Sequence, residues 1–266
     1  MADGRPIDRW AVGAAYEPYV GRWSRRVADT FLPWLAVPPG GHWLDVGCGT
    51  GALTGTILAH AAPRAVRGVD TSAGFIGYAQ TQIDDPRATF GVADAQALPD
   101  ADGTYDAVVS GLALNFIPQP ARALGEMARV TRPGGIIAAY VWDYDGEMQL
   151  MRHFWDAAVA LDPAARALDE GQRFSLCHPD ALSTLYRDAG LQEIETRAID
   201  IPTHFRDFDD YWSPFLGGQG SAPSYLASLD EDMKAAIRDR LRARLPIAPD
   251  GSISLLARAW AVRGRR

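Results

Sequence analysis

A glycine-rich turn between an apolar segment and an expected helix is the part of this sequence best suited to chemistry. Residues 44–51 read LDVGCGTG, and Gly47 and Gly49 allow a sharp turn that brings N–H groups close to a ligand, because neither has a Cβ atom. The helix expected to begin near Gly51 points its positive end at the same place. Asp70 closes the next expected strand, about 20 residues further on, where a carboxylate could bind both hydroxyls of a ribose. These features predict a βαβ unit that binds a nucleotide.

Four segments carry a resemblance to a known family. Residues 44–51 resemble motif I of the class I S-adenosylmethionine-dependent methyltransferases, in which an acidic residue precedes the turn as Asp45 does here. Residues 92–95 (VADA), 105–110 (YDAVVS) and 129–135 (RVTRPGG) resemble the family's later motifs and follow in the same order. Within the family the chain is similar to the ubiquinone- and menaquinone-biosynthesis group, methyltransferase types 11 and 25. The resemblance implies S-adenosyl-L-methionine as the cofactor.

The resemblance also implies roles for individual residues. The glycines of the turn would admit the amino acid end of the donor, and Asp45 would hold the turn or the donor's amino group. Asp94 would accept from the adenine amino group, together with the Ala95 backbone. Tyr16 is similar to N-terminal tyrosines that fold over the cofactor, with core packing as the alternative. The residues expected to bind the cofactor are Tyr16, Asp45, Gly47, Gly49, Gly51, Asp70, Thr71, Asp94, Ala95 and Ser110.

Apolar segments alternate with helical stretches through the first half of the chain, which indicates a largely parallel sheet with right-handed crossovers. The expected strands are Trp43–Val46, Ala65–Val69, Ala88–Val92, Tyr105–Ser110 and Ile136–Val141, with later strands at 192–199 and 253–262. Helices are expected at about 20–34, 147–161, 179–189 and 229–245. The fold class is α/β, a Rossmann-like doubly wound sheet that is mostly parallel with an antiparallel last strand, plus a helical substrate cover. One domain is expected over 1–266, with a cofactor-binding core at 16–142 and insertions at 143–178 and 200–250 that cover the acceptor site.

The acceptor is expected at the carboxyl ends of strands four and five. Strand five runs into residues 142–144 (WDY), where Trp142 could touch the acceptor; alternatively Trp142 packs the cover helix and Asp143 caps it. An apolar acceptor wall is expected from aromatic residues of the cover, with core packing as the alternative: Tyr211, Trp212 and Phe215. The end of strand four lacks both the Asn-Pro-Pro-Tyr type of motif that holds a planar nitrogen and the acidic cluster that holds magnesium, so no metal is expected.

Three side chains are candidates for a general base: His153, His204 and Asp143. None of them is assigned, and His153 falls on the polar face of its expected helix, which favours a solvent-exposed position. A base is not required, because the sulfonium donor is already electrophilic. Holding donor and acceptor in line at roughly 3–3.5 Å supplies much of the rate of such a displacement.

Composition restricts the classes of partner. The chain has 266 residues, 47% of them hydrophobic, a formal net charge of −7 and only two cysteines. The negative charge disfavours a nucleic-acid substrate, and no apolar run approaches the roughly 20 residues that cross a bilayer. We therefore expect a cytoplasmic protein that acts on a small-molecule acceptor through an oxygen, nitrogen or carbon nucleophile, with no nucleic acid and no membrane as partner.

Two other functions stay open at this point. Residues 47–52 also satisfy the G-x-G-x-x-A template of dinucleotide-binding proteins, which suits an NAD(P)-dependent oxidoreductase. A non-catalytic, methyltransferase-like binding protein would keep the donor site and lack an acceptor. The sequence predicts neither the acceptor nor the oligomeric state.

Overall fold

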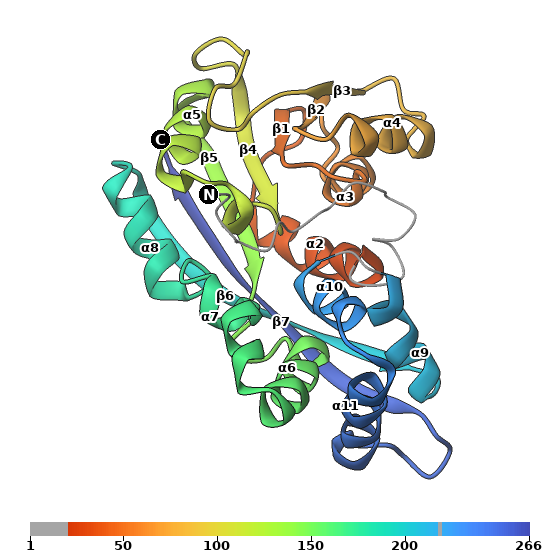
Figure 1. Ribbon diagram of the computed structural model, residues 1–266. Helices are drawn as coiled ribbons and strands as arrows, with labels where there is room; N and C mark the ends of the chain where they lie inside the picture. The colour runs from red at the N-terminus through yellow and green to blue at the C-terminus, as the bar shows by residue number, and fades with distance from the viewer. Residues whose placement is uncertain (1–20, 218–219) are drawn as a thin grey trace.

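A seven-stranded sheet organises the molecule, which is a computed structural model that describes residues 21–217 and 220–266 (Figure 1). The strands stand in the order β3-β2-β1-β4-β5-β7-β6, and the first five of these are parallel. Strand β7 runs antiparallel to both of its neighbours. This confirms the expected Rossmann-like α/β sheet with an antiparallel last strand. The strands are β1 (His42–Val46), β2 (Ala65–Asp70), β3 (Ala88–Val92), β4 (Tyr105–Gly111), β5 (Thr131–Trp142), β6 (Gln192–Phe205) and β7 (Ile253–Arg265).

Helices connect and cover these strands. The described helices are α2 (Arg22–Leu35), α3 (Ala52–His60), α4 (Ala73–Gln82), α5 (Pro120–Val130), α6 (Gln149–Leu161), α7 (Glu170–Arg173), α8 (Pro179–Asp188), α9 (Phe208–Trp212), α10 (Ser221–Ser228) and α11 (Glu231–Arg244). Short 3-10 turns lie at η2 (Leu114–Phe116), η3 (Pro163–Leu168) and η4 (Ser213–Gly217). Helix α2 buries an apolar face and ends where Ala36 takes a left-handed conformation with φ 52°.

The β6–β7 hairpin is longer than the rest of the sheet. Strand β5 pairs with β7 only as far as Ala259, whereas β6 stays paired with β7 to Ile253. Strand β6 continues past its expected end at Ile199 to Phe205, because alternate side chains from Ile199 onward are buried on one face. Helices α6, α9 and α11 gather at this projecting end (Figure 1). We call residues 200–205 and 253–258, where only β6 and β7 pair, the hairpin extension. Helices α6, α9 and α11 form the helical part of the chain, which packs around this extension.

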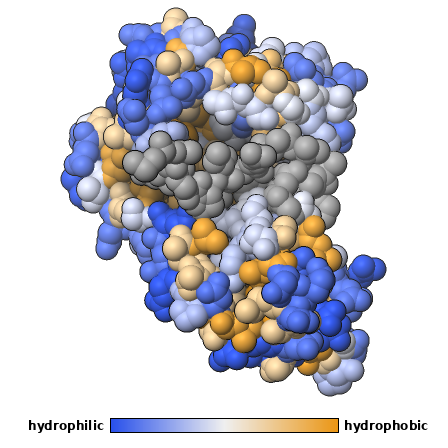
Figure 2. Space-filling model, viewed as in Figure 1, coloured by the Kyte–Doolittle hydropathy of each residue, from blue (hydrophilic) through white to orange (hydrophobic). Residues whose placement is uncertain are grey.

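One hydrophobic cluster joins the sheet to the helical part. It runs from Trp23 in α2 through the strands to Leu241 in α11, with Trp43, Trp142 and Trp155 among its largest fully buried side chains. Figure 2 shows a mostly polar face, on which apolar residues form several small patches. Within the described ranges, no helix has both the length and the apolar character needed to span a bilayer.

Candidate functional site

A cavity of about 480 Å³ opens at the carboxyl ends of the parallel strands. The turn after β1 and the segments after β2 and β3 line one side, and the segments after β4 and β5 line the other. Of the residues expected to bind cofactor or acceptor, those that line the cavity are Asp45, Gly47, Gly49, Asp70, Thr71, Asp94, Ala95 and Trp142. Neither Gly51 nor Ser110 is among the lining residues. Tyr16 lies outside the described residues.

The glycine turn is held by backbone hydrogen bonds. The N–H groups of Gly47 and Cys48 donate to the carbonyl of Val69 at 2.8 and 3.0 Å, which ties the turn to the end of β2. Gly47 and Gly49 have φ angles of 72° and 51°, in the left-handed region that favours glycine. Helix α3 begins directly after the turn, with its N-terminus at the cavity. The turn can therefore present N–H groups and a positive helix end to the same ligand.

Gly47 also has no room for a side chain. A Cβ atom at this position would collide with the Cβ of Ala113, which follows β4. We expect Gly47→Ala to lower the free energy of unfolding by about 1 to 3 kcal/mol, through overpacking and strain at positive φ. Urea denaturation measures this. Gly125→Ala is the matched control, because Gly125 lies in α5 with no atom near its added Cβ. Equal stability of the two variants would contradict the prediction.

Asp45 is fully buried beneath the turn. Its Oδ2 accepts a hydrogen bond from the Thr54 hydroxyl at 2.7 Å, and its Oδ1 accepts none from the described residues. Burial raises the pKa of Asp45 to about 7, against the lowering effect of the Thr54 hydrogen bonds. Asp45 also lines the cavity, so its carboxylate is a natural partner for a positively charged group of a ligand.

Two further acids stand at the ends of β2 and β3. Asp70 accepts from the N–H groups of Gly49 and Ser72 at 3.1 and 2.8 Å, so its carboxylate is fixed in orientation; burial raises its pKa. Asp94 is exposed and accepts from the backbone and side-chain nitrogens of Gln96, and these hydrogen bonds lower its pKa. Both carboxylates line the same cavity as the glycine turn.

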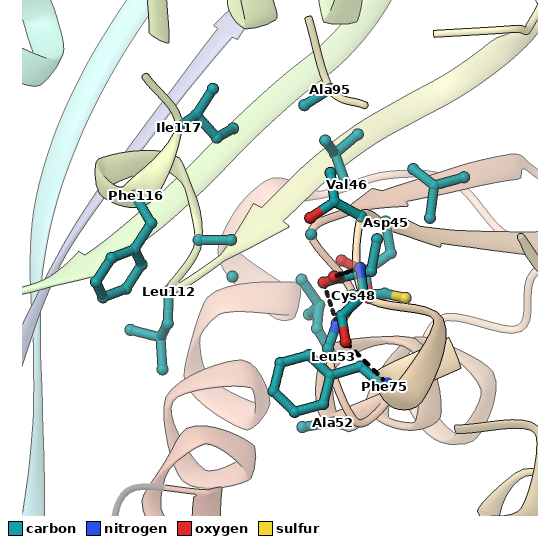
Figure 3. Close-up of a pocket in the computed structure, with 18 of the residues that line it drawn as sticks. Asp45, Val46, Cys48, Ala52, Leu53, Phe75, Ala95, Leu112, Phe116 and Ile117 are labelled. Carbon is teal, nitrogen blue, oxygen red and sulfur yellow. Dashed lines mark hydrogen bonds between the residues drawn. The ribbon is translucent and has the colours of Figure 1, made fainter. Parts of the chain in front are cut away.

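The opposite side of the cavity is apolar and aromatic. Figure 3 shows Phe116, Leu112 and Ile117 on one side of the cavity, with Asp45 and Cys48 on the other. Sequence reasoning missed several of the lining residues: Phe75, Leu112, Phe116, Tyr140 and Met151. Leu112 and Phe116 could have been found by their position, because they follow the end of β4, where ligands bind in such sheets.

Three aromatic rings extend this side. Phe174, at the end of α7, packs against Phe116 with ring centroids 5.0 Å apart and against Tyr144 at 5.6 Å. Phe116 and Tyr144 line the cavity. We call Phe116, Tyr144 and Phe174 the aromatic wall.

None of the three candidate bases lines the cavity. Asp143 is buried and accepts from the N–H groups of Gly146 and Glu147 at 3.2 and 3.0 Å, so it caps the turn between β5 and α6. His204 is exposed on the hairpin extension opposite Ser254. His153 is half-buried on α6, and burial lowers its pKa. The structure therefore brings none of them to the glycine turn and the acids that line the cavity.

The three aromatic residues expected as an acceptor wall lie in the core of the helical part. Tyr211 is buried and donates its hydroxyl to the carbonyl of Leu150 at 2.9 Å. Phe215 stacks on Phe154 with centroids 4.6 Å apart, and Trp212 packs beside Phe215. None of the three lines the cavity, because α9 and η4 pack against Phe205 of the hairpin extension and Phe154 of α6.

Over residues 21–217 and 220–266, no group of three or more histidine, cysteine or acidic side chains is arranged to hold a metal ion. Cys48 is buried in the glycine turn, and burial raises the pKa of its thiol.

Comparisons with known proteins agree with this geometry. Residues 44–139 match the family model described as a methyltransferase domain. The chain is 31% identical over 188 residues to the 2-methyl-6-phytyl-1,4-hydroquinone methyltransferase of Synechocystis sp., an alignment that covers 69% of this chain and 57% of that protein. It is 33% identical over 172 residues to the malonyl-[acyl-carrier protein] O-methyltransferase of Pectobacterium atrosepticum, covering 65% and 64%. The chain thus spans less than two thirds of the length of either relative.

Solved structures share the fold. Phosphoethanolamine N-methyltransferase 2 of Haemonchus contortus, solved with phosphomonomethylethanolamine and S-adenosylhomocysteine, superposes with a TM-score of 0.61 at 15% identity, over 96% of this chain and 56% of that one. The sheet order, the glycine turn and the matched segment lead to one conclusion. Over residues 44–139 the chain matches the model of a methyltransferase domain, and the sheet that contains this segment has the fold of the solved methyltransferase structure.

Proposed function

We propose that the chain binds S-adenosyl-L-methionine in the cavity and transfers its methyl group to a small organic acceptor. The observation that carries the proposal is the two-sided cavity. Polar groups of the glycine turn with Asp45, Asp70 and Asp94 line one side, and apolar and aromatic groups line the other. Its volume of about 480 Å³ is within the range of small-molecule sites.

Each polar group suits one part of the donor. The carboxylate of the donor's amino acid end would lie at the N–H groups of the turn and the N-terminus of α3, and its ammonium group on the side of Asp45. Asp70 would bind the ribose hydroxyls, and Asp94 the adenine amino group. The donor's methyl group would then point toward the apolar side.

The reaction would be an in-line displacement. A lone pair on oxygen, nitrogen or carbon of the acceptor attacks the methyl carbon, the carbon–sulfur bond breaks, and its electron pair stays on sulfur in S-adenosylhomocysteine. An acceptor that carries a proton on the attacking atom gives that proton to solvent. The chain contributes alignment and the exclusion of water, which together account for much of the rate of such reactions. We assign no general base and no metal ligand.

The aromatic wall favours an acceptor with an apolar, planar part. The two relatives carry the names of a hydroquinone methyltransferase and a malonyl-carrier O-methyltransferase, so relatedness by itself does not select an acceptor class. In this chain the aromatic residues Phe116 and Tyr144 line the cavity. Flat apolar groups pack well on such surfaces.

Calorimetric titration with S-adenosylhomocysteine, beside the same titration with NAD⁺, tests the donor assignment. We expect micromolar binding of the first and none of the second. Binding of NAD⁺ alone would overturn the proposal in favour of a dinucleotide-dependent oxidoreductase, to which the G-x-G-x-x-A pattern also conforms.

A second experiment tests catalysis. The protein is incubated with methyl-labelled donor and a fractionated small-molecule extract, and Asp70→Ala is the control. Labelled product formed only by the unmodified chain supports methyl transfer. Donor binding without labelled product from any fraction would indicate a non-catalytic binding protein.

A further inference from the structure

Tyr144 stands in the loop between β5 and α6, and an arginine of α6 holds its backbone. Arg152 Nη1 donates to the Tyr144 carbonyl at 3.0 Å. The same guanidinium binds both oxygens of Asp169, with Nη1 3.1 Å from Oδ1 and Nη2 2.6 Å from Oδ2. We call the loop between β5 and α6 the cavity loop, because Tyr144 lines the cavity. One side chain, that of Arg152, therefore connects the cavity loop, α6 and the start of α7.

Asp169 in turn fixes α7. Its Oδ1 accepts from the Gly171 N–H at 2.9 Å and so caps the N-terminus of this short helix. Four residues separate Asp169 from Phe174, whose N–H donates to the Glu170 carbonyl and whose ring packs on both other members of the aromatic wall. Arg152 and Asp169 thus bind the two segments that carry Tyr144 and Phe174.

Gly171 shows how closely these segments approach. A Cβ atom there would lie 2.7 Å from Arg152 Nη1, 2.9 Å from Asp145 Cα and 3.0 Å from the Tyr144 carbonyl oxygen. Two of these three atoms are backbone and cannot move aside cheaply. No side chain fits between α7 and the cavity loop while the wall keeps its present position.

The ion pair is largely withdrawn from solvent. The Arg152 and Asp169 side chains are 17% and 7% exposed. Burial opposes the charge on Arg152, but the hydrogen bonds and charge of Asp169 outweigh it, so the pKa of Arg152 is raised. A guanidinium offers parallel N–H groups to a carboxylate, a geometry that a lysine ammonium cannot reproduce.

We propose that the Arg152–Asp169 pair is a positioning element that sets where Tyr144 and Phe174 stand, and so defines the acceptor side of the cavity. That the acceptor binds on this side rests on the proposed function, whereas the position of the aromatic wall does not depend on it. Arg152 and Asp169 do not line the cavity, and they act on it through Tyr144 and Phe174.

Fluorine NMR of the protein labelled with 3-fluorotyrosine tests the proposal. The chain has nine tyrosines, and Tyr144→Phe identifies the resonance of Tyr144. We expect Arg152→Lys to shift and broaden this resonance, because lysine keeps the charge but loses the paired contacts with Asp169 and the Tyr144 carbonyl. S-adenosylhomocysteine affinity should change by less than about twofold, since the donor contacts share no partner with Arg152.

Arg87→Lys is the matched control. Arg87 also binds both oxygens of an aspartate, Asp85, and donates to a backbone carbonyl, that of Leu58. It lies between α4 and β3, so its replacement should leave the Tyr144 resonance unchanged.

Gly171→Ala is a second variant. It keeps every charge, and its added Cβ atom forces α7 away from the loop between β5 and α6. We expect it to shift the Tyr144 resonance as well. A Tyr144 resonance that stays in place in both Arg152→Lys and Gly171→Ala, with both proteins folded, overturns the proposal. Absence of S-adenosylhomocysteine binding to the unmodified chain would instead overturn the proposed function and leave the resonance test valid.

Discussion

Replacement of Asp70 by alanine is expected to abolish most of the donor affinity while the fold survives. Asp70 is held by N–H groups of Gly49 and Ser72, so its carboxylate is already oriented at the end of β2. Charge-assisted hydrogen bonds contribute about 1.5 to 3 kcal/mol each, so loss of the ribose contact should weaken S-adenosylhomocysteine binding about 100-fold. Calorimetric titration measures the dissociation constant, and circular dichroism checks the fold.

Asp106→Ala is the matched control for this prediction. Asp106 also accepts from a backbone N–H, that of His42 at 2.6 Å, but it lies at the amino end of the parallel strands, away from the cavity. Its loss should leave donor affinity unchanged. If Asp70→Ala bound S-adenosylhomocysteine as tightly as the unmodified chain, Asp70 would have no part in donor binding.

The second large effect is a dependence on pH through Asp45. Burial raises the pKa of this carboxyl from 3.8 to about 7 in the folded chain, so the folded state holds the proton more tightly than the unfolded state. The stability contributed by this group is fully present below pH 3.8 and is lost as pH rises to about 7. The loss amounts to at most about 4 kcal/mol, at 1.36 kcal/mol per tenfold change in proton affinity.

Asp45→Asn isolates this contribution. Asparagine keeps an oxygen for the Thr54 hydroxyl and does not titrate in this range. The difference in free energy of unfolding between the unmodified chain and Asp45→Asn should therefore move in favour of the variant between pH 4 and pH 8. Urea denaturation across this interval measures it. A difference that stays constant with pH would mean that Asp45 is not protonated in the folded chain near neutral pH.

The same group should make donor binding sensitive to pH in the opposite sense. The ammonium group of S-adenosylhomocysteine favours the ionised carboxylate of Asp45, whose pKa is about 7. Affinity should therefore rise about tenfold from pH 6 to pH 8 in the unmodified chain, following the ionised fraction. Asp45→Asn should bind more weakly and show no such rise. Affinity that falls with pH in the unmodified chain would place the ammonium group elsewhere.

The glycine turn and the acid at the end of β2 were predictable from the sequence because their determinants are local. The turn at Gly47 and Gly49 needs only residues adjacent in the chain, and Asp70 follows at the end of the next strand of the same βαβ unit. The alternation of strands and helices likewise depends on short-range periodicity. Sheet order and the antiparallel β7 agree with the resemblance to the methyltransferase family.

The aromatic side of the cavity was decided by tertiary structure. Phe116, Tyr144 and Phe174 come from three separate connections and meet only when β4, β5 and α7 are packed. His204 was expected in the cover, but pairing of β6 with β7 carries it onto the exposed hairpin extension. Tyr211 enters the core of the helical part for the same reason, since α9 packs where that extension leads.

A sequence pattern states which side chains are apolar and how they repeat. Which aromatic residues border the cavity and which fill the core depends on where β5 stops pairing with β7 while β6 continues, a long-range property that the local pattern does not contain. The sequence by itself therefore determined the class of the fold and the residues of the glycine turn with the acids after β2 and β3. The tertiary structure alone decided which aromatic residues line the opposite side of the cavity and that Arg152 contacts the Tyr144 backbone.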